Sequence, residues 1–164
     1  MKLHIRGVQF ITLVMAVIFF YSVAPAEEQA RTAGKEADDF RNRFSLFGGM
    51  TQEGSDHGAS VGLEYEYRLG SYLGVGGLAE YAGGDFDSWV LGVPFFIHIY
   101  AGWAVWLAPG VEIEDSETNF LFRAGMGYEF EIYPRWSLAP EVNFDFTDGD
   151  TKLVYGFTLT WRAF

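Results

Sequence analysis

The strongest constraint on the fold is a two-residue alternation that runs through the last third of the chain. Over residues 120–132 the even positions are apolar or aromatic, whereas the odd positions are mostly Gly, Glu and Arg. The same period returns over 136–146 and, with odd positions apolar, over 153–161. Successive side chains of a β-strand point to opposite faces of the sheet, so this pattern predicts three consecutive antiparallel strands.

The same alternation predicts five earlier strands, which brings the expected number to an even eight. The earlier strands are expected over residues 40–50, 58–68, 73–81, 89–97 and 103–114. Pro94 and Pro109 lie within the last two, where each removes a hydrogen-bond donor from the ladder. Polar, acidic loops near 51, 84, 115 and 148 alternate with tight turns near 70, 99 and 134. This order is typical of an all-β, antiparallel up-and-down barrel with longer loops at one end.

The beginning of the chain has the features of an export signal. Lys2 and Arg6 precede an apolar run over 8–23, and Ala24-Pro25-Ala26 fits the small-residue cleavage rule. The run is shorter than the roughly 20 residues that a helical span needs, which disfavours a retained anchor. The predicted organisation is a signal peptide over 1–26, a short periplasmic leader over 27–39 and a barrel domain over 40–164.

Charge and cysteine content exclude several classes of protein. The formal net charge of the chain is −11, and cleavage would remove Lys2 and Arg6 and make it more negative. Nucleic-acid binding is not expected, because phosphate contacts need clustered Lys and Arg. The chain contains no cysteine, so neither disulfides nor a lipid-bearing N-terminal cysteine is available.

Side-chain volume indicates which face of the predicted barrel points outward. The interior of an eight-stranded barrel is just filled by side chains or holds one small ligand, and the many Phe, Tyr, Trp and Leu of the apolar face do not fit there. The apolar face is therefore expected to meet lipid, with the barrel closed so that no strand edge remains unpaired. Aromatic residues near the strand ends are expected to form two girdles at the membrane interfaces: Tyr81, Trp89, Trp103, Trp136 and Phe146.

With these features the chain resembles the small outer-membrane β-barrels of Gram-negative bacteria, of the OmpX and OmpA transmembrane-domain type. The resemblance covers roughly residues 40–164. It implies an exported, monomeric protein of the outer membrane, in contact with lipid and lipopolysaccharide. It also implies that the terminal Phe164 belongs to a signal read by the barrel-assembly machinery. Phe164 departs from the usual pattern, because the apolar residues of the last strand, such as Phe157 and Trp161, are odd-numbered.

The polar face of the strands is predicted to line the lumen and to carry a network of charges. Its expected members are Arg43, Glu64, Glu66, Arg68, Glu80, Glu112, Arg123, Glu129, Glu141, Asp145 and Arg162. Hairpin register places Arg43 roughly opposite Glu66, and Arg123 close to Glu141 and Asp145. Because buried charges persist when they are paired, the main prediction is a plugged lumen and a structural or interaction role at the cell envelope. The alternative is a porin-like path for small or hydrophobic molecules.

Enzymatic activity and metal binding are weaker hypotheses. Ser55, Asp56 and His57, with Ser60 nearby, contain the residue types of a hydrolase triad, but neighbours in sequence seldom form one. His98 has no serine two positions on, as a lipid A deacylase-like pattern would require. The acidic loops could bridge divalent cations to lipopolysaccharide phosphates, although no spacing matches a dedicated calcium loop. No catalytic residue, metal ligand or cofactor is therefore assigned, and a soluble ligand-binding barrel is the remotest alternative.

Overall fold

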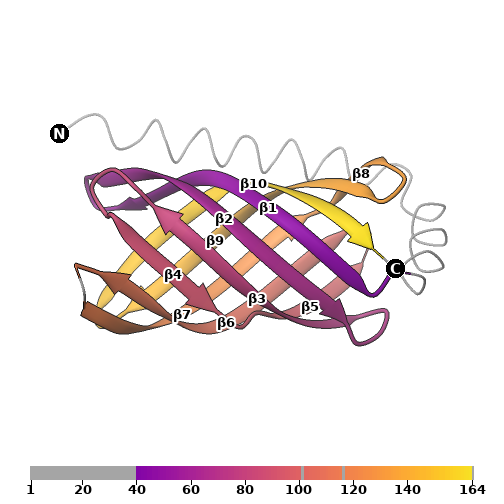
Figure 1. Ribbon diagram of the computed structural model, residues 1–164, viewed down its shortest axis with the longest axis horizontal. Helices are drawn as coiled ribbons and strands as arrows, with labels where there is room; N and C mark the ends of the chain where they lie inside the picture. The colour runs from indigo at the N-terminus through magenta and orange to yellow at the C-terminus, as the bar shows by residue number, and fades with distance from the viewer. Residues whose placement is uncertain (1–39, 101, 116, 164) are drawn as a thin grey trace.

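The computed structural model describes residues 40–100, 102–115 and 117–163, and the regular elements among them are β-strands (Figure 1). They are β1 (Asn42–Glu53), β2 (Asp56–Arg68), β3 (Leu73–Ala82), β4 (Ser88–Gly92), β5 (Phe95–Tyr100), β6 (Trp103–Glu114), β7 (Glu117–Tyr128), β8 (Phe130–Tyr133), β9 (Trp136–Thr147) and β10 (Asp150–Ala163). The predicted signal peptide and leader lie outside the described residues. Within the described part of the chain, no helix is long and apolar enough to cross a membrane.

The strands form a closed antiparallel ring. Pairing follows the order β1-β2-β3-β4-β6-β7-β9-β10, and β10 also pairs with β1, which closes the sheet on itself. β4 and β5 are two halves of one barrel strand, because both pair with β3 and β6. β7 and β8 likewise both pair with β9. The ten segments therefore make eight barrel strands, as the sequence predicts.

The interruption between β4 and β5 falls at the proline that the sequence marks. Pro94 cannot donate to a ladder, yet its carbonyl oxygen accepts the backbone N–H of Gly76 at 2.9 Å. On the other side, the N–H of Val93 donates to the carbonyl oxygen of Pro109 at 2.9 Å. Hydrogen bonding thus continues across the break, whereas Pro109 lies inside the uninterrupted β6.

The prediction of long loops at one end of the barrel is wrong. The connections that contain the acidic loops span only 54–55, 83–87, 115–116 and 148–149. We call this the loop end, and we call the opposite end, with connections 69–72, 101–102 and 134–135, the turn end. The strands continue into their acidic tips, where Glu53 pairs with Asp56 and Glu114 with Glu117. The hydrogen bonds of a β-ladder join backbone groups only, so a strand can continue through residues with polar side chains. Side-chain polarity therefore did not predict where the strands end.

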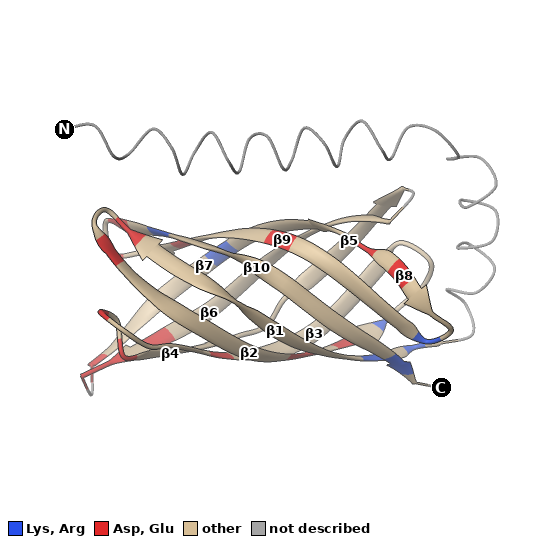
Figure 2. Ribbon diagram, turned by 90° about the horizontal axis from the view of Figure 1, so that it is seen from above, with Lys and Arg blue, Asp and Glu red and all other residues tan. Residues whose placement is uncertain are grey.

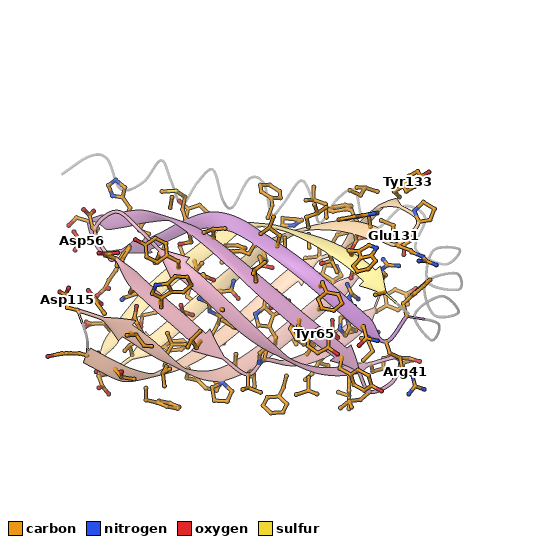
Figure 3. All side chains as sticks on the ribbon, in the orientation of Figure 1. Arg41, Asp56, Tyr65, Asp115, Glu131 and Tyr133 are labelled. Atoms are coloured by element: carbon orange, nitrogen blue, oxygen red, sulfur yellow. The ribbon has the colours of Figure 1, made fainter. Side chains whose placement is uncertain are left out.

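Apolar side chains cover the outside of the barrel, and charged ones lie inside (Figure 3). Leu63 is 67% exposed and Phe120 63%, whereas Arg123 is 3% and Asp145 2% exposed. In a soluble protein the large apolar side chains are mostly buried and the charged ones mostly exposed. Lys, Glu, Arg and Asp are almost never fully buried there unless they are paired. The predicted orientation of the two faces is therefore confirmed, and it is the one that suits a transmembrane barrel.

Aromatic side chains also fill part of the interior. Phe47, Phe96 and Trp106 are buried. Trp106 Nε1 donates to Asn143 Oδ1 at 2.8 Å. Gly125 leaves room for this contact, because a Cβ there would lie 2.1 Å from Asn143 Oδ1 and 2.3 Å from Trp106 Nε1. The glycines of the polar face thus admit large side chains from neighbouring strands into the lumen.

Candidate functional site

An arginine bound by two carboxylates crosses the middle of the lumen. Arg123 of β7 donates through Nε and Nη2 to the two oxygens of Asp145, at 2.6 and 2.7 Å. Asp145 is its register partner on β9. Arg123 Nη1 donates to Glu80 Oε2 of β3 at 2.7 Å, across the barrel. The planar guanidinium matches this bidentate geometry, and both charges of the pair with Asp145 are buried with their hydrogen bonds made.

A second cluster lies in the lumen toward the loop end. Lys152 Nζ of β10 donates to Glu112 Oε1 of β6 at 2.7 Å, and Ser88 Oγ donates to the same oxygen at 3.0 Å. Lys152 Nζ also lies 5.1 Å from the centre of the Phe86 ring, which is buried. This contact places the ammonium group between a carboxylate and an aromatic face.

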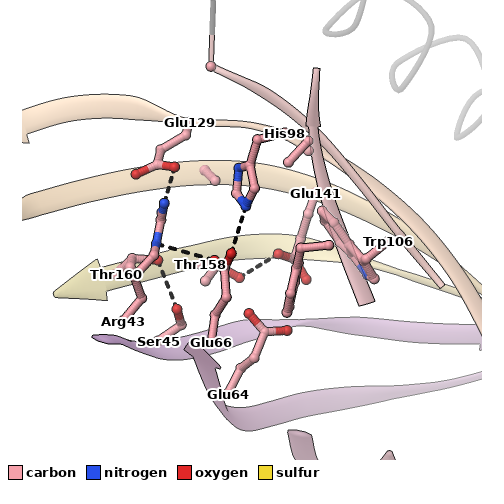
Figure 4. Close-up of a pocket in the computed structure, with 15 residues that line it drawn as sticks. Arg43, Ser45, Glu64, Glu66, His98, Trp106, Glu129, Glu141, Thr158 and Thr160 are labelled. Carbon is pink, nitrogen blue, oxygen red and sulfur yellow. Dashed lines mark hydrogen bonds and ion pairs between the residues drawn. The ribbon is translucent and has the colours of Figure 1, made fainter. Parts of the chain in front are cut away.

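The third and largest cluster fills the lumen toward the turn end (Figure 4). Arg43 Nη2 contacts Glu129 Oε2 at 2.5 Å, and Arg43 Nε lies 3.4 Å from Glu66 Oε2. Arg162 Nη2 contacts the other oxygen of Glu129 at 3.0 Å. His98 Nε2 lies 2.7 Å from Glu66 Oε1. Register places Arg43 directly opposite Glu66, where the sequence expected it.

Two predicted members of the network have no ion pair among the described residues. Glu64 has no described hydrogen bond, and Glu141 has only neutral partners. Arg68 lies 3.8 Å from Glu66 and donates to the carbonyl oxygen of Ser71 at 2.7 Å. The other predicted members, each with a charged partner within 4.0 Å, are Arg43, Glu66, Glu80, Glu112, Arg123, Glu129, Asp145 and Arg162.

Sequence reasoning missed two members of the lumen clusters, Lys152 and His98. Both occupy even positions in strands whose odd positions face outward, so the parity of the alternation was a sufficient signal for both. Lys152 was passed over because it lies beside the polar turn before β10, and His98 because it lies beside a predicted tight turn. Trp106 obeys the same parity and is buried in the lumen.

A cavity of about 50 Å³ lies inside the turn-end half of the barrel. Glu64, Glu141 and Trp106 line it, together with members of the turn-end cluster. A smaller cavity of about 20 Å³ adjoins Arg123 and Glu80. Volumes of this size hold a few waters or a small ion. Neither cavity has space for a drug-sized ligand.

The predicted interface aromatics lie on the outer surface. Trp89, Trp136 and Phe146 are exposed, and Tyr81 and Trp103 are half-buried. The Tyr81 ring lies 5.2 Å from that of its register partner Trp89, with the two planes tilted by 49°, and the Tyr81 hydroxyl donates to Asp87 at 2.6 Å. The predicted assembly signal, Phe164, lies outside the described residues, so its register stays a prediction.

The residues considered for catalysis do not form a triad. His57 Nδ1 lies 3.2 Å from the backbone oxygen of Ser55, and His57 is exposed. Ser60 is buried in the lumen, where its hydroxyl lies 2.6 Å from that of Thr51. Among the described residues, no group of three or more His, Asp or Glu side chains could hold a metal ion.

Charge is divided between the two ends of the barrel (Figure 2). Asp56 and Asp115 lie at the loop end, whereas Arg41 lies at the turn end (Figure 3). The exposed acids at or beside the loop-end connections are Asp56, Asp85, Asp87, Asp115, Glu117, Asp148 and Asp150. The loop end is thus an acidic surface, and arginine concentrates at the turn end.

No family model matches the chain, and no curated protein matches its sequence. Solved structures do match. Ail, the attachment invasion locus protein of Yersinia pestis, in complex with the heparin analogue sucrose octasulfate, is 12% identical with a TM-score of 0.55, over 74% of this chain and 97% of Ail. Neisserial surface protein A is 9% identical with a TM-score of 0.50, over 74% of this chain and 96% of that one. A designed transmembrane β-barrel is 14% identical with a TM-score of 0.51, over 74% and 95%.

At these identities the likeness is one of fold. The chain has the architecture of a small eight-stranded outer-membrane β-barrel, and Ail, one of the proteins that it matches, is described as an outer membrane protein. The resemblance predicted from the sequence is confirmed at this level.

Proposed function

We propose that the protein is an outer-membrane barrel of a Gram-negative envelope, with a closed lumen and a structural or interaction role rather than a catalytic one. The observation that carries the proposal is the buried contact of Arg123 with Asp145 and Glu80 in the middle of the lumen. Clusters around Lys152 and Arg43 lie on either side of it. An ion crossing the barrel would have to separate charges that are hydrogen-bonded and shielded from water, which is costly.

The outer wall supports the membrane part of the proposal. Its large exposed apolar side chains run around the ring, which is closed and so leaves no unpaired strand edge. Lipid and lipopolysaccharide are the proposed contacts of this wall, and the barrel-assembly machinery is the proposed route of insertion.

The exposed carboxylates of the loop end limit the kind of macromolecule that could bind there. A structure of Ail holds a sulfated heparin analogue. The exposed carboxylates at the loop end here, among them Asp85, Asp87 and Asp115, would repel such a polyanion. If this end binds a macromolecule, we infer that the partner surface is basic or that divalent cations bridge it to phosphate.

Single-channel recording on the refolded protein tests the closed lumen. The expected result is no discrete opening from protein whose folded state is verified by heat-modifiable mobility on a gel. A variant with Arg123, Glu80 and Asp145 all replaced by alanine removes the central contact and leaves the clusters around Lys152 and Arg43 in place. Openings in this variant alone would show that the central contact is what closes the lumen. Stable cation-selective openings of the unmodified protein would instead favour the porin-like alternative.

A further inference from the structure

A positive charge without a carboxylate partner lies at the turn end, outside the lumen. Arg135, in the 134–135 connection, is exposed and forms no ion pair with a described carboxylate. Glu131, the acid of the same hairpin, contacts Arg162 instead, at 2.6 Å. The guanidinium of Arg135 lies 5.2 Å from the centre of the Phe40 ring, a contact that leaves its N–H donors available to an anion. Because Phe40 lies just before β1, the guanidinium reaches from the start of β9 to the start of β1.

The turn itself does not explain an arginine at this position. The φ angle of Arg135 is 75°, in the left-handed region that favours glycine. The carbonyl oxygen of Arg135 accepts the backbone N–H of Arg162 at 2.8 Å, which ties the turn to β10. A glycine would make this turn with less strain, so the presence of arginine points to a role for its side chain.

A row of four aromatic side chains begins next to Arg135 on the outer wall. Its members are register partners in succession across β9, β10, β1 and β2: Trp136, Trp161, Phe44 and Tyr65. The ring of Phe44 lies 5.9 Å from that of Trp161 and 5.2 Å from that of Tyr65. All four side chains are between 36% and 48% exposed. The row crosses the seam where β10 meets β1 (Figure 1), and Trp and Tyr are the residues that favour the level of lipid headgroups.

The wall becomes aliphatic beyond the aromatic row. Two residues further along the same four strands lie the register partners Leu138, Leu159, Leu46 and Leu63. The next outward position on β1 is Gly48, whose register partners Phe157 and Val61 are 57% and 54% exposed. A Cβ at Gly48 would meet nothing within 4 Å, so the wall has a notch between these two side chains. The notch lies about 13 Å along β1 from Phe44, within the roughly 15 Å of hydrocarbon in one leaflet.

The order of these features matches the order of groups in a phospholipid. An arginine binds phosphate through paired N–H donors, aromatic rings suit the region of the headgroup and esters, and leucines suit an acyl chain. A free anion in solution would use the arginine alone. Since the charge of Arg135 is not compensated by a described carboxylate, a headgroup with a net negative charge is favoured over a zwitterionic one.

We propose that the outer wall at the turn end binds an anionic phospholipid, such as phosphatidylglycerol. Its phosphate lies at Arg135, and one acyl chain lies over Leu46 and Leu159 and enters the notch at Gly48. The inference rests on the proposed placement of the outer wall in a membrane, and it adds a preference for one class of lipid at one place on that wall.

The test is the quenching of Trp161 by brominated lipid. The other four tryptophans are replaced by phenylalanine, and the protein is refolded into phosphatidylcholine vesicles. These contain a small fraction of either dibrominated phosphatidylglycerol or dibrominated phosphatidylcholine. Trp161 lies within the aromatic row, so its quenching reports which lipid is there. Brominated phosphatidylglycerol is expected to quench as if enriched roughly five-fold, the preference that one arginine near a membrane surface provides.

Three variants make the result specific. Arg135→Gln keeps a polar side chain without the charge and should abolish the enrichment. Gly48→Leu fills the notch, where a side chain meets open space, and should lower the enrichment. The matched control is a variant that keeps Trp89 alone, because Trp89 is 51% exposed on the same wall but close to exposed acids such as Asp87. It should show no preference for phosphatidylglycerol.

The possible failures can be told apart. Equal quenching of Trp161 by the two brominated lipids, or an enrichment that persists in Arg135→Gln, would overturn the proposal while the membrane placement stands. Absence of quenching by either lipid would overturn the membrane placement and the proposal with it. An unchanged enrichment in Gly48→Leu would contradict the notch as the place of the acyl chain. Sodium phosphate and sodium chloride at equal ionic strength should weaken the enrichment equally, and a greater loss with phosphate would mean that Arg135 binds the free anion instead.

Discussion

At the scale of single residues, the interior depends on charges that are expensive to bury alone. Arg123 is 3% exposed, and it satisfies two carboxylates that are equally hidden, Glu80 and Asp145. Removing one member of such a group leaves the other charges buried without a partner, which strongly lowers the free energy of unfolding. Replacing the whole group by neutral side chains costs much less. Arg123 is therefore the residue whose loss should be felt most.

Arg123→Leu is expected to destabilise the folded barrel by about 3–5 kcal/mol, the usual cost of breaking a buried ion pair. The measurement is the temperature at which the folded gel band converts to the unfolded one, which should fall. Arg135→Leu makes the same change at an exposed arginine that lies over the Phe40 ring, and it should change stability by no more than about 0.5 kcal/mol.

Adding Glu80→Gln and Asp145→Asn to Arg123→Leu should recover much of the lost stability, because no uncompensated charge then remains. An Arg123→Leu barrel that converts at the temperature of the unmodified protein would contradict the importance of this contact.

At the scale of strands, the alternation predicted the elements better than their ends. Each of the eight predicted strands is present, yet several acidic residues expected in loops, such as Glu53, Asp56 and Glu117, belong to the strands. Side-chain polarity reports burial, whereas a strand ends where its backbone partner ends. Pro94 indicated a weak point where the break after β4 occurs. The break before β8, at Glu129, has no comparable signal in the sequence.

Closure of the ring by β1 and β10 can be tested with an engineered disulfide. Ser45 and Thr160 are register partners, and their hydroxyl oxygens lie 2.9 Å apart inside the barrel. Directly opposed residues of antiparallel strands have Cα atoms about 4.5–5.5 Å apart, within the range that a disulfide spans. Since the chain has no cysteine, Ser45→Cys with Thr160→Cys should form a single intramolecular bond on oxidation.

The measurement is gel mobility after full heat denaturation. The cross-linked double variant should migrate faster than its reduced form, because the bond closes most of the barrel sequence into a loop. Each single variant provides the control. Failure of the folded double variant to cross-link would show that β1 and β10 do not meet in this register.

At the scale of the whole molecule, the barrel is apolar outside and charged inside, and its two ends differ in charge (Figure 2). The chain contains five tryptophans, and two of them, Trp89 and Trp106, lie on opposite faces of the barrel wall. Trp89 is 51% exposed on the outer wall, whereas Trp106 is 7% exposed in the lumen. The two environments should respond differently to probes placed in a lipid bilayer.

In single-tryptophan variants refolded into lipid with brominated acyl chains, Trp89 is expected to be quenched strongly and Trp106 weakly. The reason is that only an outward-facing ring can contact bromine at the membrane interface. The other tryptophans are replaced by phenylalanine in both variants, so each serves as the control for the other. Stronger quenching of Trp106 than of Trp89 would mean that the apolar face is not the lipid-facing one.

The two-residue alternation was enough to predict the strands, the face on which alternate residues lie and the partners across each hairpin, such as Arg43 and Glu66. These properties follow from a period of two residues and from pairing between adjacent strands, which are local. The contacts across the lumen, between Arg123 and Glu80 and between Arg43 and Glu129, could not be predicted from the alternation. Those distances depend on the tilt and stagger of the closed ring, which relate strands that are not neighbours. The same closure brings Glu64 and Glu141 to the wall of a shared cavity.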